Sequence, residues 1–274
     1  MVHVSGTENS GDAHLLEFPD GRIILIDTGF DRYTRRDLIP FLDKRGITHI
    51  DDLIITHAHR NHYEGIGSLL EHLKGIKRVY FNLPPKSRCD QETWSTGCDY
   101  EHVLATRETI KSAGVSLLEL RTGQSFYNEG ADIELKVVYV HDGLSPPIGE
   151  TSINDTSAVT YLRFGKVSVF FSADLDKDVG AYIAKHLALP QADILTAPHH
   201  GVESAAPNEF LAKINAKVLM VSVAKKHWLG KRGDRIRLFA EQHKMPVYVT
   251  GIHGNVTVRL RRDGYDITTE KAAK

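Results

Sequence analysis

The 274-residue sequence has no apolar run near the roughly 18 residues that are needed to cross a bilayer. Its first residues do not combine a basic start with an apolar core, so we expect no secretory signal peptide. Charge of one sign is not in excess either, because the formal net charge is −1. The sequence therefore predicts no membrane segment, and any attraction to nucleic acid or to a membrane surface must be local.

Cysteine is scarce: Cys89 and Cys98 are the only two. Two cysteines are too few for the disulfide framework of a small secreted domain. A pair in a loop-like stretch could contribute to a zinc site, but we interpret them as two free thiols. The expected compartment is the cytoplasm, where thiols stay reduced.

Internal repeats, low-complexity segments and convincing linkers are also missing, so we expect one domain over residues 1–274. A hydrophobic content of 41% is enough for a substantial core. Periodicity predicts strands at His14–Phe18, Arg22–Asp27, Leu53–Thr56, Arg78–Asn82, Val115–Leu120, Ile133–Val140, Ala158–Phe164, Val167–Ser172, Ile194–Ala197, Val218–Val223, Val247–Thr250 and Val256–Leu260. The predicted helices are Arg35–Lys44, Gly65–Leu73, His102–Ala113, Val179–Leu187 and Ile236–Gln242.

These elements form two similar halves, which predicts an α/β (α+β) protein with two sheets packed face to face and helices outside. Two stretches read as loops. Residues 142–155 are rich in Gly, Pro and Ser, and residues 83–100 contain two prolines and both cysteines. We expect the loop at 83–100 to lie over a site.

Histidine, in contrast, is abundant: there are fifteen, and they cluster. The segment Thr56-His57-Ala58-His59-Arg60-Asn61-His62 follows a predicted buried strand. Side chains alternate in extended backbone, so His57 and His59 point the same way, and His62 can return to the same point after a turn. Neutral imidazole is the commonest protein ligand for zinc-like ions.

Two other predicted strands end in similar residues. Asp174 directly follows one strand, and His199-His200-Gly201 follows another. A polar loop that is rich in histidine by chance would not repeat this pattern at three strand ends. We therefore predict a metal centre on one face of the sheet assembly.

The segment His57-Ala58-His59-Arg60-Asn61-His62 resembles the His-x-His-x-Asp-His signature of the metallo-β-lactamase superfamily. The resemblance extends from Gly11–His14 and Asp27-Thr28-Gly29 to Ser172-Ala173-Asp174 and Ala197–Gly201. Within the superfamily the sequence is most similar to the soluble hydrolase domain of the bacterial DNA-uptake competence protein, partly through Asn154-Asp155-Thr156-Ser157. The resemblance implies a four-layer αββα sandwich with a two-metal site between the sheets.

Carried over position by position, the resemblance implies that His57 and His59 hold the first metal, while Asn61 and His62 face the second. Asp174 would bridge both ions. One of the pair His199–His200 would bind the second metal, with His199 preferred, and the other would contact the substrate or leaving group. Asp27 would orient a ligand histidine, or it is a plain turn residue at a strand end. The implied catalytic side chains are Asp174, His200 and Asn61.

Two positions depart from the family pattern. Asn61 stands where the family has Asp, and an amide oxygen can bind a metal but brings no charge and cannot act as a base. The family also has another histidine between the first motif and the bridging Asp. His72, His102 and His141 are the candidates, and His141 is preferred because it ends a predicted strand; the alternative is that water fills the place.

The implied chemistry is hydrolysis by a metal-bound hydroxide, with one or two zinc or manganese ions as cofactor. We expect a phosphodiester substrate, either a small molecule or nucleic acid. One alternative is a lactone, thioester or amide (β-lactamase-like) hydrolase, since the fold supports many chemistries. Another is a degenerate metal-binding regulatory module without catalysis.

A basic run lies at residues 225–237, with six basic residues: Lys225, Lys226, Lys231, Arg232, Arg235 and Arg237. It is interpreted either as a phosphate-binding edge or as a solvated loop and helix start. Trp228 within the run could stack on a base or could anchor the loop.

Overall fold

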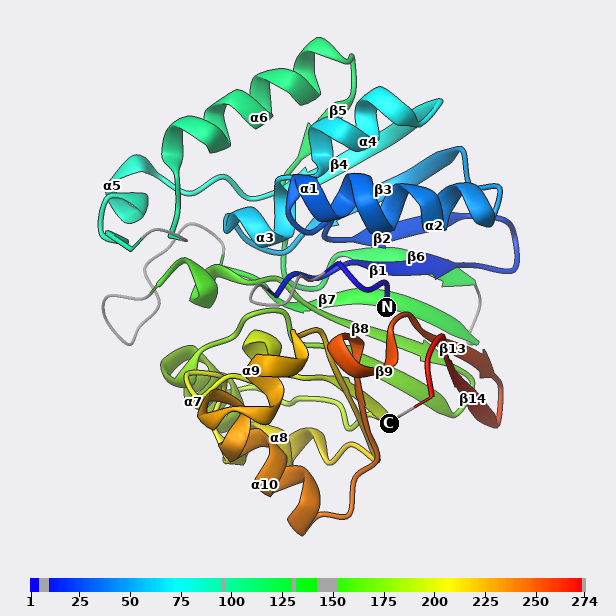
Figure 1. Cartoon of the computed structure of the whole chain (residues 1–274), viewed down its shortest axis with the longest axis vertical. Helices are drawn as coiled ribbons and strands as arrows, with labels where there is room; N and C mark the ends of the chain where they lie inside the picture. Colours follow the sequence, from blue (N-terminus) through cyan, green and yellow to red (C-terminus); the bar gives the residue numbers. More distant parts are fainter. Residues whose placement is uncertain (5–9, 95–96, 130–131, 142–151, 273–274) are drawn as a thin grey trace.

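The computed structural model describes residues 1–4, 10–94, 97–129, 132–141 and 152–272. Two β-sheets pack face to face, and helices cover the outer face of each (Figure 1). The expected four-layer αββα sandwich is confirmed. No helix in these described ranges is long and apolar enough to span a membrane.

The first sheet has the strand order β1-β2-β3-β4-β5. β1 pairs antiparallel with β2, and the other pairs are parallel. Its strands are β1 (His14–Glu17), β2 (Ile23–Ile26), β3 (His49–Ile55), β4 (Gly75–Phe81) and β5 (Ser116–Leu118). The helices of this half are α1 (Asp31–Tyr33), a π-helical turn (Thr34–Leu38), α2 (Ile39–Lys44), α3 (Arg60–Tyr63), α4 (Ile66–His72), α5 (Lys86–Cys89) and α6 (Tyr100–Ser112).

The second sheet has the order β12-β11-β10-β9-β8-β7-β6. Its strands are β6 (Ser125–Glu129), β7 (Ile133–Tyr139), β8 (Val159–Phe164), β9 (Val167–Phe171), β10 (Ile194–Thr196), β11 (Val218–Val221) and β12 (Val247–Val249). Pairs from β6 to β9 are antiparallel, and pairs from β9 to β12 are parallel. Helices α7 (Lys177–His186), α8 (Asn208–Ile214), α9 (Lys225–Leu229), α10 (Asp234–Gln242) and α11 (Thr250–His253) belong to this half, with short 3₁₀ turns at Ile153–Thr156, Pro198–Gly201 and Lys231–Gly233.

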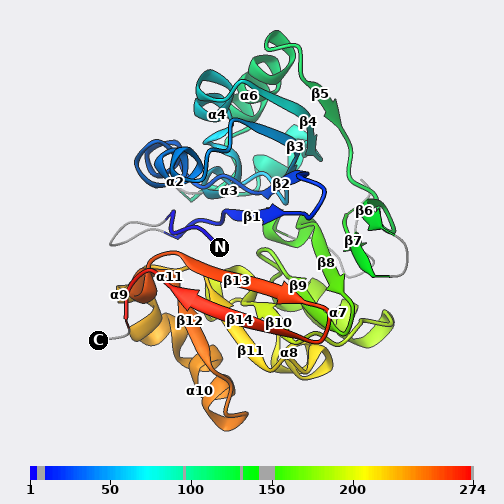
Figure 2. The same ribbon diagram turned by 90° about the vertical axis from the view of Figure 1, so that its right-hand side faces the viewer.

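A two-stranded hairpin, β13 (Val256–Arg261) and β14 (Gly264–Thr269), completes the chain. Figure 2 shows it along the side of the molecule, close to the N-terminus. Met1 and Val256 exchange backbone hydrogen bonds at 2.9 and 3.0 Å. The hairpin thereby ties the end of the chain to its beginning.

The strands near the middle of the sandwich are apolar on both faces, because each sheet is covered on both sides. Ile24 and Ile26 of β2 pack between the sheets with Val169 and Phe171 of β9. Leu25 points the other way, into the cluster beneath the outer helices. This double burial explains why the strands read as continuous apolar runs.

Several elements differ from those expected. The predicted helix at Arg35–Lys44 begins earlier, at Asp31, and contains the π-helical turn. Among the elements not anticipated are β6, α8, α9 and β14. β14 carries few apolar residues and contacts only β13 within its sheet, so it lacks the pattern of a buried strand. Most of the expected loop at 142–155 lies outside the described residues.

The expectation of two free thiols is wrong, because Cys89 and Cys98 form a disulfide. α5 and the turn after it fold the loop back on itself, so that the two Cα atoms lie 4.8 Å apart and both side chains are buried. This proximity depends on the path of an irregular loop, which composition does not reveal. The cysteines therefore no longer support the expected cytoplasmic location.

The parallel strands place their carboxyl ends at one edge of the sandwich. β2 leads into Asp27 and β3 into Thr56, while β9 and β10 of the other sheet lead into Asp174 and Pro198. A backbone hydrogen bond of 2.9 Å from Ala158 N to Thr56 O joins the two halves at this edge. Residues from distant parts of the sequence therefore meet here.

Phe170 provides a test of the packing that supports β9. Its side chain is fully buried, and its ring contacts the ring of Phe210 edge-on at 5.9 Å. We expect Phe170→Ala to lower the free energy of unfolding by about 3–5 kcal/mol through lost contacts and a cavity. Leu238→Ala is the matched control, because Leu238 is 54% exposed on α10 and should change stability by less than about 0.5 kcal/mol. Urea denaturation followed by circular dichroism measures both, and equal losses would contradict this account of the core.

Candidate metal centre

The three histidines of the first motif are placed by the end of β3 and the start of α3. His59 is still extended, with φ −91° and ψ 141°, and the chain then turns so that His62 N donates to His59 O at 2.9 Å. His57 Nε2 lies 3.2 Å from His59 Nδ1. His57 and His62 rings are neighbours, with centroids 4.1 Å apart. The predicted convergence of His57, His59 and His62 is therefore found in the structure.

Asp174 comes from the other half and meets these histidines. Ala173 before it has a φ of 47°, which turns the chain sharply after β9, and Asp174 N donates to Ser157 Oγ at 3.2 Å. Its Oδ2 lies 3.2 Å from His62 Nε2 and 3.9 Å from His57 Nε2. Burial disfavours ionisation of Asp174, but His200 and His62 hold its pKa well below the usual range.

The pair His199–His200 lies on a turn in which both residues adopt left-handed backbone, with φ values of 45° and 54°. The two rings consequently point in different directions. His200 is buried, and its Nε2 lies 3.2 Å from Asp174 Oδ2 and 2.9 Å from Asn61 Nδ2. His199 is partly exposed, with its Nδ1 2.7 Å from Asp176 Oδ1 and its Nε2 3.9 Å from Asp174 Oδ2. His200 is thus the deeper member of the pair.

The donor set fits a divalent transition metal. Ligand atoms about 2.0–2.1 Å from a tetrahedral zinc ion lie about 3.3 Å from each other, close to the 3.2 Å separations at His57–His59, His62–Asp174 and His200–Asp174. Asp174 Oδ1 is buried without a hydrogen-bond partner among the described residues. Imidazole nitrogen and carboxylate oxygen together suit zinc and manganese.

Two groups of side chains each have their ligand atoms within 4.8 Å of one another. One consists of His57, His62 and Asp174, and the other of Asp12, Asp174 and His200. Asp174 belongs to both groups. Burial lowers the pKa of His57, which favours the neutral imidazole that binds metals. Burial lowers the pKa of His200, but Asp174 and Asp12 together outweigh that effect and raise the pKa to about 10.

Asp27 lies directly behind His62, as the resemblance implied. Its Oδ2 is 2.8 Å from His62 Nδ1, and its two oxygens accept hydrogen bonds of 2.8 Å from Thr56 N and Thr56 Oγ1. A carboxylate on Nδ1 leaves Nε2 of the ring free to face Asp174. Asp27 is therefore more than a turn residue at a strand end.

Two further carboxylates, not predicted as site residues from the sequence, lie beside the histidines. Glu92 Oε2 lies 2.6 Å from His59 Nε2, and Asp12 Oδ1 lies 3.6 Å from His200 Nδ1. Glu92 belongs to the loop at 83–100, which was expected to lie over a site, so its place in that loop was the available signal. Asp12 stands in the Gly11–His14 segment that carried the family resemblance.

The histidine candidates between the motifs do not join this cluster. His72 on α4 pairs with Asp43 on α2 at 2.7 Å, and His102 Nδ1 lies 3.0 Å from Tyr63 Oη. The backbone carbonyl oxygen of His141 accepts a hydrogen bond of 3.4 Å from Asn82 Nδ2. His141 is absent from the metal-capable groups found within the described ranges. His141 is therefore not proposed as a metal ligand.

A cleft of about 450 Å³ opens above the cluster. Its walls come from both halves of the molecule and from the loop at 83–100, and they include an exposed indole, that of Trp94. The lining residues are Ser10, Phe30, His59, Asn61, Trp94, Ser152, Asn154, Asp174, Asp176, His199, His200, Val202, Ser204, His227 and Arg232.

Only part of the basic run reaches this cleft. Arg232 lines it, together with His227. Arg237 donates to Trp228 O and pairs with Asp234, and Trp228 itself is 6% exposed within the core. The structure therefore supports the anchoring alternative for Trp228, since a buried indole offers no face for stacking.

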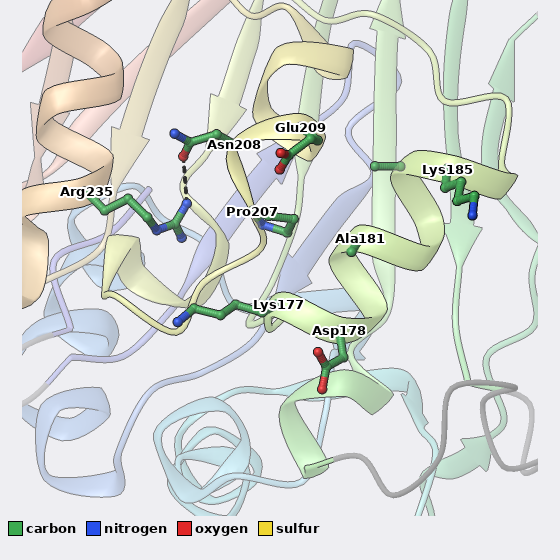
Figure 3. Close-up of a pocket in the computed structure, with 9 residues that line it drawn as sticks. Lys177, Asp178, Ala181, Lys185, Pro207, Asn208, Glu209 and Arg235 are labelled. Carbon is green, nitrogen blue, oxygen red and sulfur yellow. Dashed lines mark hydrogen bonds between the residues drawn. The ribbon is translucent and has the colours of Figure 1, made fainter.

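Arg235 faces a different hollow, of about 770 Å³, between α7 and α8. Figure 3 shows its guanidinium hydrogen-bonded to Asn208 at 2.8 Å, with Lys177 and Lys185 elsewhere on the wall. Arg235 also donates to the carbonyl oxygens of Ala205 and Ala206. It therefore braces the segment before α8 and does not face the metal centre.

Comparison with known proteins shows the family of the chain. A family model described as "Beta-lactamase superfamily domain" matches residues 22–221. The chain belongs to this superfamily. ComE operon protein 3 of Bacillus subtilis (strain 168) is 27% identical to it over 225 residues, which are 82% of this chain and 26% of that protein. The chain thus spans about a quarter of the length of that relative.

Among solved structures, CmlA, a diiron β-hydroxylase from Streptomyces venezuelae, is similar with a TM-score of 0.50 and 12% identity, over 95% of this chain and 54% of CmlA. A single-residue mutant of CmlA is similar with a TM-score of 0.51 and 13% identity, over 88% of this chain and 51% of the mutant. These likenesses establish the fold alone. The predicted membership of the metallo-β-lactamase superfamily is confirmed, and the fold together with the histidine and aspartate groups implies divalent metal ions.

Asn61 provides a test of the second metal site. Its amide faces both His62 Nε2, at 3.1 Å, and His200 Nε2, at 2.9 Å, where a carboxylate would add a full negative charge. We expect wild type to bind two ions with unequal affinity, or one ion only. Asn61→Asp should tighten the weaker site by about tenfold or more, equal to roughly 1.4 kcal/mol.

Calorimetric titration with zinc or manganese measures both variants. Thermal unfolding of metal-free protein serves as the control that the substitution leaves the fold intact. Equal, tight binding of two ions to wild type would contradict this account of Asn61.

Proposed function

We propose that the chain, acting as a single domain over residues 1–274, hydrolyses a phosphodiester with the help of zinc or manganese, and that nucleic acid is among its substrates. The observation that carries this proposal is the meeting of histidines from both halves on Asp174 at the floor of a cleft whose wall bears Arg232. A cationic wall beside a metal centre suits an anionic substrate better than a neutral one.

In the proposed ligand set, His57 Nε2 and His59 Nδ1 would hold a first ion. His62 Nε2 and His200 Nε2 would hold a second, together with Asn61 once its amide is turned so that Oδ1 takes the place of Nδ2. Asp174 would serve both ions. His200 replaces His199, the ligand preferred from sequence, because its Nε2 lies 0.7 Å nearer to Asp174 Oδ2 (3.2 against 3.9 Å) and its ring is buried.

A bound divalent ion supplies a Lewis acid and lowers the pKa of water, which makes a nucleophile available near pH 7. The side chains around it have separate tasks. Asp27 holds the His62 ring through Nδ1, so that Nε2 stays directed at Asp174. Asn61 cannot accept the proton of an attacking water as a carboxylate would, so no base is assigned to it.

His199 lines the cleft and is more exposed there than His200, which is buried against Asp174. Asp176 fixes its ring through Nδ1 at 2.7 Å, and Asp176 is itself held by Ser152 Oγ at 3.2 Å and Asn154 Nδ2 at 3.1 Å. Because the Nδ1–H of His199 is donated to Asp176, the ring carries a proton on Nε2 only as the imidazolium, and in that form Nε2–H can donate to the bound substrate. We assign His199 the protonation of the leaving oxygen.

Arg232 supplies the charge that recognises the phosphate. It is exposed on the cleft wall and carries a planar guanidinium that can donate two hydrogen bonds to phosphate oxygens. Arg235 and Arg237 are engaged with the protein itself, so they are not assigned to the substrate.

A single experiment distinguishes the proposed role of His200 as a metal ligand from that of His199 as a proton donor. His200→Ala should lose much of its bound metal, whereas His199→Ala should keep its metal and lose about 10²–10⁴-fold in kcat. Asp174→Ala is expected to lose both, and His72→Ala, on the exposed side of α4, is the matched control. Elemental analysis gives the metal content, and hydrolysis of a deoxydinucleotide, whose alkoxide leaving group needs a proton, with zinc, manganese or no metal gives the activity.

Absence of metal from wild type, even after zinc or manganese is added, would overturn the proposed centre. Loss of metal from His199→Ala alone would reverse the two assignments. Hydrolysis confined to lactones, thioesters or lactams would reject the phosphodiester substrate and support the alternative hydrolase.

Arg232 and Lys231 form a matched pair, since both are exposed and only Arg232 lines the cleft. Hydrogen bonds to charged groups contribute about 1.5–3 kcal/mol, so Arg232→Gln should lower kcat/KM for a phosphodiester about 10- to 100-fold, chiefly through KM. Lys231→Gln should have a much smaller effect. On single-stranded DNA the activity should also fall as salt rises. Equal effects of the two substitutions would show that the cleft wall does not select the substrate.

A further inference from the structure

Glu92 is a buried carboxylate for which the proposed chemistry has no use. It is 8% exposed and lies in the loop between α5 and α6. Its Oε2 is 2.6 Å from Nε2 of His59, while Nδ1 of the same ring faces His57 Nε2 at 3.2 Å. The two nitrogens of His59 therefore have different partners, a carboxylate on one side and the first metal position on the other.

The carboxylate of Glu92 is held by the backbone of two separate segments. Cys98 N donates to Oε2 at 2.9 Å, and Ile153 N donates to Oε1 at 2.8 Å. Gly97 packs so closely that a Cβ added to it would lie 2.9 Å from Glu92 Cβ. These contacts fix the orientation of the Glu92 side chain, so that Oε2 points toward His59.

The Cys89–Cys98 disulfide closes the loop around Glu92. Glu92 N donates to Cys89 O at 3.0 Å, so the glutamate is joined by hydrogen bonds to both half-cystines. Both cysteine side chains are buried, with Cys89 2% and Cys98 9% exposed. The bridge thereby limits how far the Cys98 amide can move from the Glu92 carboxylate.

We propose that Glu92 is a positioning residue for the first metal ligand His59, and that the Cys89–Cys98 disulfide keeps Glu92 in place. A hydrogen bond from His59 Nε2–H to Glu92 selects the tautomer in which Nδ1 carries the lone pair for the metal. Glu92 also orients the ring and makes it a stronger donor. The inference rests on the proposed metal centre, because it concerns how tightly that centre binds its first ion.

The test is a zinc titration of the purified full chain. Removing a carboxylate behind a ligand histidine costs about 10- to 100-fold in metal affinity, so Glu92→Gln should weaken the tighter site by that factor. Glu101→Gln, on the exposed first turn of α6, is the matched control and should bind zinc as wild type does. The absorption spectrum of the cobalt-loaded protein is a second readout, because it reports ligand geometry. It should change in Glu92→Gln and not in the control.

The disulfide is tested by replacing both cysteines with alanine, which leaves no thiol that could bind zinc itself. Cys89→Ala/Cys98→Ala should weaken zinc binding, by less than Glu92→Gln does. Combined with Glu92→Gln, the cysteine substitutions should cause no further loss, because the disulfide acts through Glu92. Circular dichroism of the metal-free proteins establishes that each variant is folded before its affinity is compared.

The outcomes separate this inference from the proposed function. If wild type binds neither zinc nor manganese, the proposed metal centre fails. If wild type binds zinc and Glu92→Gln binds it equally well with an unchanged cobalt spectrum, the positioning role is overturned and the centre stands. If the cysteine and Glu92 effects simply add, the disulfide does not act through Glu92 and that part of the proposal is wrong.

Discussion

The buried carboxylate of Asp174 is the point on which the rest of the site depends. Its Oδ2 lies 3.2 Å from His62 Nε2, which comes from the first half, and 3.2 Å from His200 Nε2, which comes from the second. A charge removed from water is costly unless it is paired or binds a metal. The two halves of the sandwich can pack closely at this edge because each brings partners for the same carboxylate.

Carboxylates stand behind most of the histidine rings. Asp27 contacts His62 and Asp176 contacts His199 at 2.8 and 2.7 Å, and Glu92 contacts His59 at 2.6 Å. His57 differs, because hydroxyl groups of Thr56 and Ser157 lie near its Nδ1, at 3.1 and 3.3 Å. A partner on one ring nitrogen determines which tautomer the other presents, so these groups decide the direction of each donor. The site is thus a set of oriented rings rather than a loose cluster.

The same arrangement separates metal binding from substrate contact. His200 is buried against Asp174, whereas His199, its neighbour in sequence, faces the cleft beside Asp176. The separation follows from two consecutive left-handed residues, a backbone conformation that costs about 1–3 kcal/mol per residue and persists only where surrounding contacts enforce it. His199 N donating to Ala173 O at 2.9 Å is one of these contacts.

Periodicity and element order predict two packed sheets with helices outside, and the two-residue spacing of His57 and His59 predicts that their side chains point the same way, because both are local properties of the chain. The four-layer αββα sandwich was implied by the family resemblance. The sequence also placed Asp27 and Asp174 at strand ends. Only the tertiary structure decided which of His199 and His200 points inward, since a left-handed turn reverses neighbouring side chains without any composition signal. It alone brought Glu92 to His59 and Cys89 to Cys98, because an irregular loop follows contacts that are distant in sequence rather than a repeating pattern.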